Sequence, residues 1–359
     1  MPSRLLSLDI TPKISSDFLK KNLHLKVLGI MRRCINEFSD GDVVDDVFLL
    51  ADKQIRANRN AALYLLVELR DRTGSISARM WNVTEESQAH LQPGGLVQVK
   101  GKTQLYQGTL QLIATHIYHV PHDGFDMAEF LPRSNRDVSK LAIRLREILM
   151  TIEDPPLRAL MECFLIDEKL MQNFELAPAG TKAHHAYQGG LIEHVVNMLE
   201  VAHRTADLYP DVNRELLLAG IFLHDIGKVR ELSYENGFGY TDEGQLIGHM
   251  IIAIEMLSEK IRESIELTRE PFPEETSIRL KHLIASHHGS YEYGSPRLPM
   301  TPEAIALHYI DNLDAKIHEF TRDINNDPNP QSTWTAFNAR LDRKLFKGPR
   351  KTDAAPKAR

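Results

Sequence analysis

Much of the fold and chemistry of this chain can be inferred from LLLAGIFLHDIGK, residues 216–228. The first eight residues are apolar or glycine, and such a run predicts a helix that is buried on all sides. The helix ends in His224 and Asp225, two side chains that can bind a metal ion, and a glycine and Lys228 follow. A His-Asp pair is weak evidence by itself, because His122-Asp123 forms another one in a turn without helical context.

Metal-binding residue types recur in four other apolar segments. These are His194 in GLIEHVV (190–196), His249 in LIGHM (246–250), the pair His287-His288, and Asp311 in YIDNLD (309–314). An unpaired polar side chain would be costly to bury in such segments, and metal coordination offsets that cost for several residues at once. The alternative is a set of unrelated histidines scattered through the core.

The order H…HD…H…HH…D resembles that of the HD-domain metal-dependent phosphohydrolases. Carried over by position, this resemblance implies two sets of ligands. A first ion would be held by His194, His224, Asp225 and Asp311, and a second by His249, His287 and His288, with Asp225 bridging the two. The pair His287-His288 leaves open which of the two is the main ligand. Asp314, one turn after Asp311, would orient this helix rather than bind an ion.

This ligand chemistry predicts a hydrolytic centre. Imidazole and carboxylate ligands together suit Mn²⁺, Fe²⁺, Zn²⁺ or Co²⁺ better than Mg²⁺. Two such ions about 3.5–4 Å apart activate water and bind the oxygens of a phosphoryl group. Asp225 and Lys228 are the candidate catalytic residues, with Lys228 stabilising negative charge at the scissile phosphate. The alternative for Lys228 is a solvated side chain after a helix-ending glycine.

Composition bounds the class of protein. The chain has 359 residues, enough for two or three domains, with 42% hydrophobic and 26% charged residues, as in soluble globular proteins. Runs of 18 or more apolar residues and a secretory signal are both absent from the sequence, which argues against a membrane protein. Two cysteines cannot form a disulfide framework, so we expect a cytoplasmic protein. Sixteen histidines are more than this length would suggest.

The charge is unevenly distributed. A formal net charge of −6 argues against a strong nucleic-acid binder overall. However, residues 338–359 contain eight Lys or Arg against two Asp or Glu, a local charge of +6. A basic end on an acidic body can bind a polyanion at one place only, although a solvated, disordered terminus is the simpler interpretation.

Short β runs separated by turns occupy residues 42 to about 120. We expect strands over 48–51, 62–69, 75–81, 96–101, 103–106 and 109–113, separated by turns such as Asp71-Arg72-Thr73-Gly74 and Pro93-Gly94-Gly95. About five strands in so short a segment predict a small closed barrel. The order of strands and turns resembles the OB-fold, so the chain is expected to be multidomain, with an all-β OB barrel followed by an all-α HD domain.

OB barrels bind single-stranded nucleic acid by stacking bases on exposed aromatic side chains and by tracking phosphates with basic ones. The candidate residues on the expected strands are Tyr64, Arg79, Trp81, Lys102 and Tyr106. Which face of the barrel each of them occupies stays open. Residues 42–122 contain eight basic and eight acidic residues, so binding there should be modest.

Helical periodicity begins at Val138 and continues to about Phe320. Further on, Trp334, Phe337, Leu341 and Leu345 fall at helical spacing and predict a last amphipathic helix. The expected organisation is an N-terminal extension (1–41), an OB domain (42–122), a linker with connecting helices (123–179), an HD domain (180–325), and a C-terminal helix with a basic tail (326–359).

Five segments resemble the YhaM-type 3′-5′ exoribonucleases. They are KAHHAYQGGLIEHVVNMLEVA (182–202), FLHDIGKVREL (222–232), IGHMIIAIEML (247–257), ASHHGSYEYGSP (285–296) and IALHYIDNLDAK (305–316). The resemblance spans about 42–348 and implies a 3′-5′ exonuclease that degrades single-stranded RNA, and often DNA, to nucleoside monophosphates. It further implies that the activity favours Mn²⁺ and that the protein forms a homo-oligomer. The N-terminal extension and a longer first hairpin near residues 53–60 depart from the family, which leaves the substrate preference open.

Two other functions are compatible with the sequence. One is hydrolysis of a small nucleotide or a cyclic dinucleotide, although the G-Y-P signature expected after the paired histidines is replaced by Gly289-Ser290-Tyr291. The other is a non-catalytic nucleic-acid-binding regulator in which the metal site has become structural. The complete ligand set makes the regulator the least favoured of the three.

Overall fold

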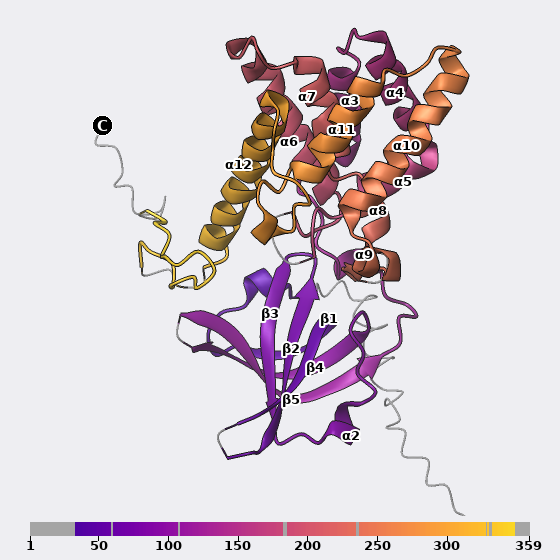
Figure 1. Cartoon of the computed structure of the whole chain (residues 1–359). Coiled ribbons are helices and arrows are strands. Elements are labelled where there is room, and N and C mark those ends of the chain that lie inside the picture. Colours follow the sequence, from indigo (N-terminus) through magenta and orange to yellow (C-terminus); the bar gives the residue numbers. More distant parts are fainter. Residues whose placement is uncertain are drawn as a thin grey trace, which may run out of the picture.

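The computed structural model describes residues 33–58, 60–106, 108–181, 185–234, 237–327, 329 and 332–348. Most of the expected N-terminal extension and the basic tail beyond Gly348 therefore lie outside the described residues. The described part consists of a β-barrel and a larger helical domain, with the C-terminal segment along one side of both (Figure 1).

Five strands form the closed barrel in the order β1-β2-β3-β5-β4. They are β1 (Val43–Ala57), β2 (Leu63–Asp71), β3 (Gly74–Trp81), β4 (Leu96–Tyr106) and β5 (Thr109–Val120), and a short helix, α2 (Glu85–Gln88), connects β3 to β4. Within the barrel, β3 and β5 pair in parallel and the other strand pairs are antiparallel. Alternate side chains such as Phe48, Leu65 and Leu112 fill the interior. The small all-β barrel expected from the sequence is thus confirmed.

The strand expected to break at Lys102 is continuous. A β-bulge between Lys100 and Gly101 takes the place of the predicted interruption. Glycine is needed there because a Cβ at position 101 would lie 2.3 Å from the carbonyl oxygen of Ile113.

Helices make up the second domain, as expected. They are α3 (Val138–Leu149), α4 (Pro155–Leu165), α5 (Glu168–Leu176), α6 (Gly190–Thr205), α7 (Arg214–Leu223), α8 (Lys228–Glu231), α9 (Asp242–Leu246), α10 (His249–Thr268), α11 (Glu274–Ser286) and α12 (Pro302–Asn325). Short elements lie between them: 3₁₀ turns at Ala206–Leu208 and Tyr291–Tyr293, and a small hairpin of β6 (Leu232–Ser233) with β7 (Gly239–Tyr240). Asp137, Asp154 and Asp167 cap the N-termini of α3, α4 and α5 by accepting backbone N–H groups.

Helix α7 is the central element of this domain. The eight residues from Leu216 to Leu223 are all buried, which explains why the sequence shows no polar face there. The ring of Phe222 packs edge-on against Phe164 and Phe174, each with ring centres 5.6 Å away. The helix delivers the two residues that follow it, His224 and Asp225, into the middle of the domain. Among the described residues, no helix combines the length and apolarity needed to cross a membrane.

The two domains share a packed contact. Leu49 and Leu96 of the barrel lie in one buried cluster with Phe130 of the connecting segment, and Phe238 packs against it. The guanidinium of Arg70 lies over the ring of Phe238 at 6.0 Å.

The prediction of an amphipathic helix over residues 334–345 is wrong. This segment folds back on itself, with Trp334 opposite Phe346 and Asn338 opposite Arg343. Asn338 explains the turn, because its side chain accepts hydrogen bonds from the backbone of Arg340 and Leu341 and so competes with helix formation. Asp342 adopts a positive φ of 51° within the same turn.

Candidate metal centre

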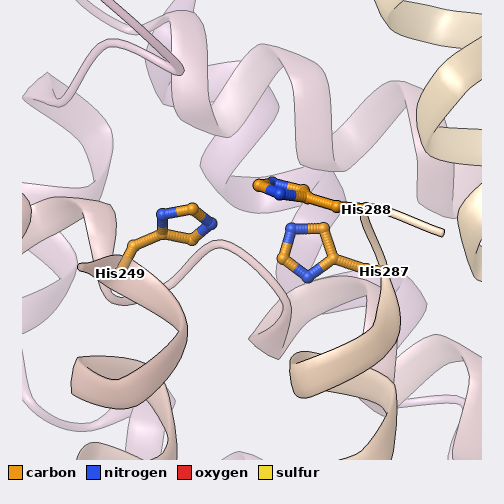
Figure 2. Close-up of side chains that lie close together, drawn as sticks. All are labelled: His249, His287 and His288. Atoms are coloured by element: carbon orange, nitrogen blue, oxygen red, sulfur yellow. The ribbon is translucent and has the colours of Figure 1, made fainter. Parts of the chain in front are cut away.

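The side chains expected to bind metal come from five helices and converge on one carboxylate. His194 lies within α6, His224 and Asp225 follow α7, His249 begins α10, His287 and His288 follow α11, and Asp311 lies within α12. Figure 2 shows the rings of His249, His287 and His288 turned toward one another. The structure thus brings all seven predicted ligands to one place.

Asp225 divides the imidazoles into two groups. Its Oδ2 lies 3.3 Å from Nε2 of His224 and 3.9 Å from Nε2 of His194. Its Oδ1 lies 3.4 Å from Nε2 of His249 and 3.6 Å from Nε2 of His287. Each carboxylate oxygen therefore faces its own pair of histidines, which is the arrangement that a bridging ligand requires.

The remaining expected ligands complete these two groups. Asp311 Oδ1 lies 3.3 Å from Nε2 of His194, on the Oδ2 side of Asp225. The His288 ring is 5.3 Å from that of His249 and 4.3 Å from that of His287. Ligand atoms within 4.8 Å of one another are found in His194-His224-Asp225, in His224-His287-Asp311 and in His249-His287-His288.

Every one of the five rings is oriented through Nδ1. In His224 and His287 this atom donates to the backbone carbonyl three residues earlier, at Ile221 and Ile284, both at 2.7 Å. The ring of His288 donates to the carbonyl of Tyr293 at 2.8 Å. Because these acceptors hold the proton on Nδ1, the lone pair of Nε2 is available to a metal ion.

Carboxylates orient the other two rings. Nδ1 of His194 donates to Asp314 at 2.7 Å, and Nδ1 of His249 donates to Glu231 at 3.0 Å. The sequence predicted that Asp314 orients its own helix, whereas in the structure it orients the ring of His194 on α6. Glu231 was missed by sequence reasoning. Its helix, α8, has only four residues, so no periodic pattern could reveal it.

Burial of these polar atoms is the test of whether a metal fits. Nε2 of His224, Nε2 of His249 and Oδ1 of Asp225 are buried without a hydrogen-bond partner among the described residues. Buried polar atoms of this kind are costly unless something binds them. A mixed set of imidazole nitrogens and carboxylate oxygens fits a divalent transition-metal ion.

Charges around the centre favour ionised carboxylates. Although burial opposes it, the charges of Lys228 and His224 hold the pKa of Asp225 well below its usual range. Burial also opposes ionisation of Asp311, but its bond to His194 lowers that pKa. Against burial, the hydrogen bonds to Asp311 and Asp314 raise the pKa of His194 to about 9. His287 is the opposite case, because burial and the neighbouring His224 keep its pKa well below the usual value.

Lys228 is buried at the centre and is not a solvated side chain. Its ammonium donates to Asp225 Oδ2 and to the carbonyl of Ala179, both at 2.7 Å. Burial lowers the pKa of Lys228, but the charge of Asp225 outweighs it and the net shift is upward. Gly227 permits this packing, since a Cβ there would lie 2.1 Å from the carbonyl oxygen of His249.

The five residues expected to bind nucleic acid all face outward from the barrel. Three of them alternate with a buried neighbour, Tyr64 with Leu65, Arg79 with Ala78, and Lys102 with Thr103, while Trp81 and Tyr106 are themselves exposed. Tyr64 and Trp81 form a cross-strand pair with ring centres 5.1 Å apart. Arg79 and Lys102 both register with Ile113 of β5, whereas Tyr106 lies farther along β4, beside the turn to β5.

Comparison with known proteins assigns families to both domains. Residues 191–316 match the HD domain, and residues 52–120 match the OB-fold nucleic acid binding domain. The chain is 36% identical over 297 residues to the 3′-5′ exoribonuclease YhaM of Geobacillus sp. (strain WCH70), covering 81% of this chain and 88% of that protein. The YhaM protein of Bacillus subtilis (strain 168) is 36% identical over 283 residues, covering 79% and 88%. That of Listeria monocytogenes serotype 4b (strain CLIP80459) is 33% identical over 321 residues, covering 89% and 99%.

Proposed function

The chain belongs to the family of YhaM 3′-5′ exoribonucleases, and we propose that it hydrolyses single-stranded RNA from the 3′ end at a centre of two divalent cations built around Asp225. The observation that carries this proposal is the division of the imidazoles between the two oxygens of Asp225. A single structural ion would not need a carboxylate that faces ligands on both sides.

Each residue has a role in this centre. His194, His224 and Asp311 would hold one ion with Oδ2 of Asp225, and His249, His287 and His288 the other with Oδ1. Such a pair of ions, when bound, supplies activated water and neutralises charge on the phosphate. The mixture of nitrogen and oxygen ligands supports a divalent transition-metal ion, and among these we propose Mn²⁺ on the resemblance to the family. Lys228 holds Asp225 in position and adds a positive charge beside the phosphate.

The barrel would hold the RNA while its 3′ end is cut. The Tyr64–Trp81 pair offers a stacking surface, and Arg79 of β3 and Lys102 of β4 lie on either side of β5, each in register with Ile113. The stacking surface and the two basic residues are suited to an unpaired strand rather than to a duplex. We propose RNA rather than DNA as the substrate, because the relatives are named exoribonucleases.

A time course on a 5′-labelled single-stranded RNA with Mn²⁺ tests the function. We expect a descending ladder that is lost with Asp225→Asn and with an RNA blocked at its 3′ end. Asp123→Asn is the matched control, because it alters the second His-Asp pair, which lies in an exposed turn. Intact RNA under every divalent metal tried would contradict the proposal, and turnover of free nucleotides in its place would support a small-nucleotide hydrolase.

A further inference from the structure

The C-terminal hairpin, residues 333–348, is a structured element with a buried side and an exposed side. Backbone hydrogen bonds join Thr335 to Leu345 at 2.9 Å and Lys347 to Thr333 at 2.7 Å. The side chains of Thr335, Leu341 and Leu345 are buried. This inner side is sufficient to explain the fold of the hairpin, so its exposed side calls for a separate explanation.

Polar contacts fix the hairpin to the last turns of α12 and to Asp327, which lies just beyond the helix. Asn338 donates to Asp323 at 2.6 Å, Arg340 pairs with Glu319 at 2.5 Å, and Lys347 pairs with Asp327 at 2.5 Å. The same helix carries Asp311 of the candidate metal centre. The hairpin is therefore attached to a helix that reaches into the site of cleavage.

Three large aromatic side chains lie on the solvent side of the hairpin. Trp334 and Phe346 are 48% and 58% exposed and form a cross-strand pair with ring centres 5.1 Å apart, and Phe337 is also exposed. A cluster of exposed aromatic rings is unusual on a soluble protein and marks a binding surface. Arg343 and Lys344 are exposed beside it, and neither forms an ion pair within the described part of the chain.

This surface adjoins the barrel. In the turn between β4 and β5, a Cβ built on Gly108 would lie 3.3 Å from Cβ of Ala336, so the turn and the hairpin are in contact. Figure 1 shows the hairpin, in yellow, between the end of α12 and the barrel. Tyr106, an exposed aromatic residue of the outer barrel face, lies two residues before Gly108. The hairpin thus borders the proposed nucleic-acid-binding face.

We propose that the C-terminal hairpin is a second binding site for single-stranded RNA, in which bases stack on Trp334 and Phe346 while Arg343 and Lys344 bind phosphates. This inference rests on the proposed nuclease function and extends its substrate path beyond the barrel. Exposed aromatic rings next to exposed basic side chains are the combination that binds single strands without sequence preference. The net positive charge of the hairpin favours a polyanion over a second copy of this acidic chain.

The two tryptophans of the sequence, Trp81 and Trp334, allow the two RNA sites to be observed separately. Trp81→Phe leaves Trp334 as the only indole, and Trp334→Phe leaves Trp81. Each full-length variant is titrated with a single-stranded RNA of about 20 nucleotides in EDTA, which prevents cleavage. We expect a saturable change in the emission of Trp334. If Trp81 responds and Trp334 does not, the hairpin proposal is overturned while the function stands. If neither responds, the hairpin proposal is also overturned, and the nuclease time course judges the function independently.

Affinity measurements supply a second test. Trp334→Ala should weaken RNA binding about five- to 150-fold, the range for one lost base–aromatic stack, whereas Trp334→Phe should retain binding. Tyr209→Ala, at an exposed aromatic residue before α7, is the matched control and should have no effect. Arg343→Ala with Lys344→Ala should reduce the salt dependence of binding by about 1.4 in log–log slope. Unchanged affinity together with a changed sedimentation coefficient for Trp334→Ala would instead identify the surface as a contact between copies.

Discussion

Glu231 accepts two hydrogen bonds from His249 at a single oxygen, Oε1, one from the backbone N–H and one from ring Nδ1, each at 3.0 Å. Both residues are buried. The two hydrogen bonds fix both the start of α10 and the tautomer of the His249 ring. As a result, Nε2 of His249 points toward Asp225. A residue outside the predicted ligand set therefore determines the orientation of a predicted ligand.

Glu231→Gln should lower the affinity for Mn²⁺ by about 10- to 100-fold, the usual effect of losing a partner behind a metal ligand. The amide cannot give His249 the charge-assisted acceptor that the carboxylate provides. Isothermal titration with Mn²⁺ measures the effect. Glu243→Gln, at a half-buried carboxylate paired with Arg230, is the control. Equal Mn²⁺ affinity in the Glu231 variant and the wild type would show that Glu231 serves only the fold.

Asp314→Asn should impair His194 in a similar way. Asp314 Oδ2 accepts from Nδ1 of His194 at 2.7 Å and from Nε2 of His185 at 2.8 Å. An asparagine can turn its amide N–H toward Nδ1 and so drive the ring proton to Nε2, where the lone pair is needed. We expect weaker Mn²⁺ binding and slower RNA hydrolysis, each by about 10- to 100-fold. Asn312→Ala, at an exposed position on the same helix, should change neither. An Asp314 variant with unaltered metal affinity would be inconsistent with this account.

Metal binding should stabilise the fold, because the ligands come from five helices that a bound ion would link. At a Mn²⁺ concentration of about 100 times Kd, the gain in the free energy of unfolding is about 2.7 kcal/mol. Thermal unfolding monitored by circular dichroism, with Mn²⁺ and then with excess EDTA, reports this gain. In Asp225→Asn the two melting curves should coincide. A metal-dependent shift of the same size in that variant would mean that the ion binds elsewhere.

The surroundings of Glu303 allow us to predict how the free energy of unfolding responds to acid. It is only 1% exposed, accepts the backbone N–H of Asn213 at 2.8 Å and pairs with Arg279 at 2.9 Å. Although burial opposes it, these partners lower its pKa from the usual 4.5. A lowered folded-state pKa means that the stabilisation is complete above pH 4.5 and is lost as the pH falls through the folded value.

Glu303→Gln should therefore reduce the free energy of unfolding by about 2 kcal/mol at pH 7, and the difference from wild type should shrink below pH 4. Urea denaturation at the two pH values measures both quantities. Glu275 contacts the same Arg279 but is 85% exposed, so Glu275→Gln should change stability by less than about 0.5 kcal/mol. A pH-independent difference for Glu303→Gln would rule out its ionisation as the cause.

Local patterns predicted most of the architecture correctly. The run from Leu216 to Leu223 gave the buried helix, and the turns at Asp71 and Pro93 gave the barrel strands, because both signals depend on neighbouring residues alone. The C-terminal hairpin was mistaken for a helix because the spacing of Trp334, Phe337, Leu341 and Leu345 is helical. Periodicity does not register the pairing of Trp334 with Phe346, which lies twelve positions later.

In the candidate site, too, some residues could be predicted from the sequence and others could not. The residues that the sequence placed around one centre are together, since their types and order carry the resemblance to the HD domain. The supporting residues were harder to find. Glu231 lies in a helix of four residues, too short for any periodic pattern, and its bond to His249 crosses 18 positions. Contacts of this kind are set by how the helices pack, which no short segment encodes.

Helix α12 also sets a length scale for the substrate. Asp311, at the metal centre, and Asp323, which holds the hairpin, are about 18 Å apart along the axis at 1.5 Å per residue. With the hairpin as the second binding site that we propose, a long RNA would occupy both places at once and remain bound through successive cuts. As the 3′ end is consumed, the strand would eventually become too short to span this helix and would dissociate from the hairpin. Digestion should then change from processive to distributive, and the last few nucleotides should accumulate as a limit fragment whose size is dictated by the helix rather than by base sequence.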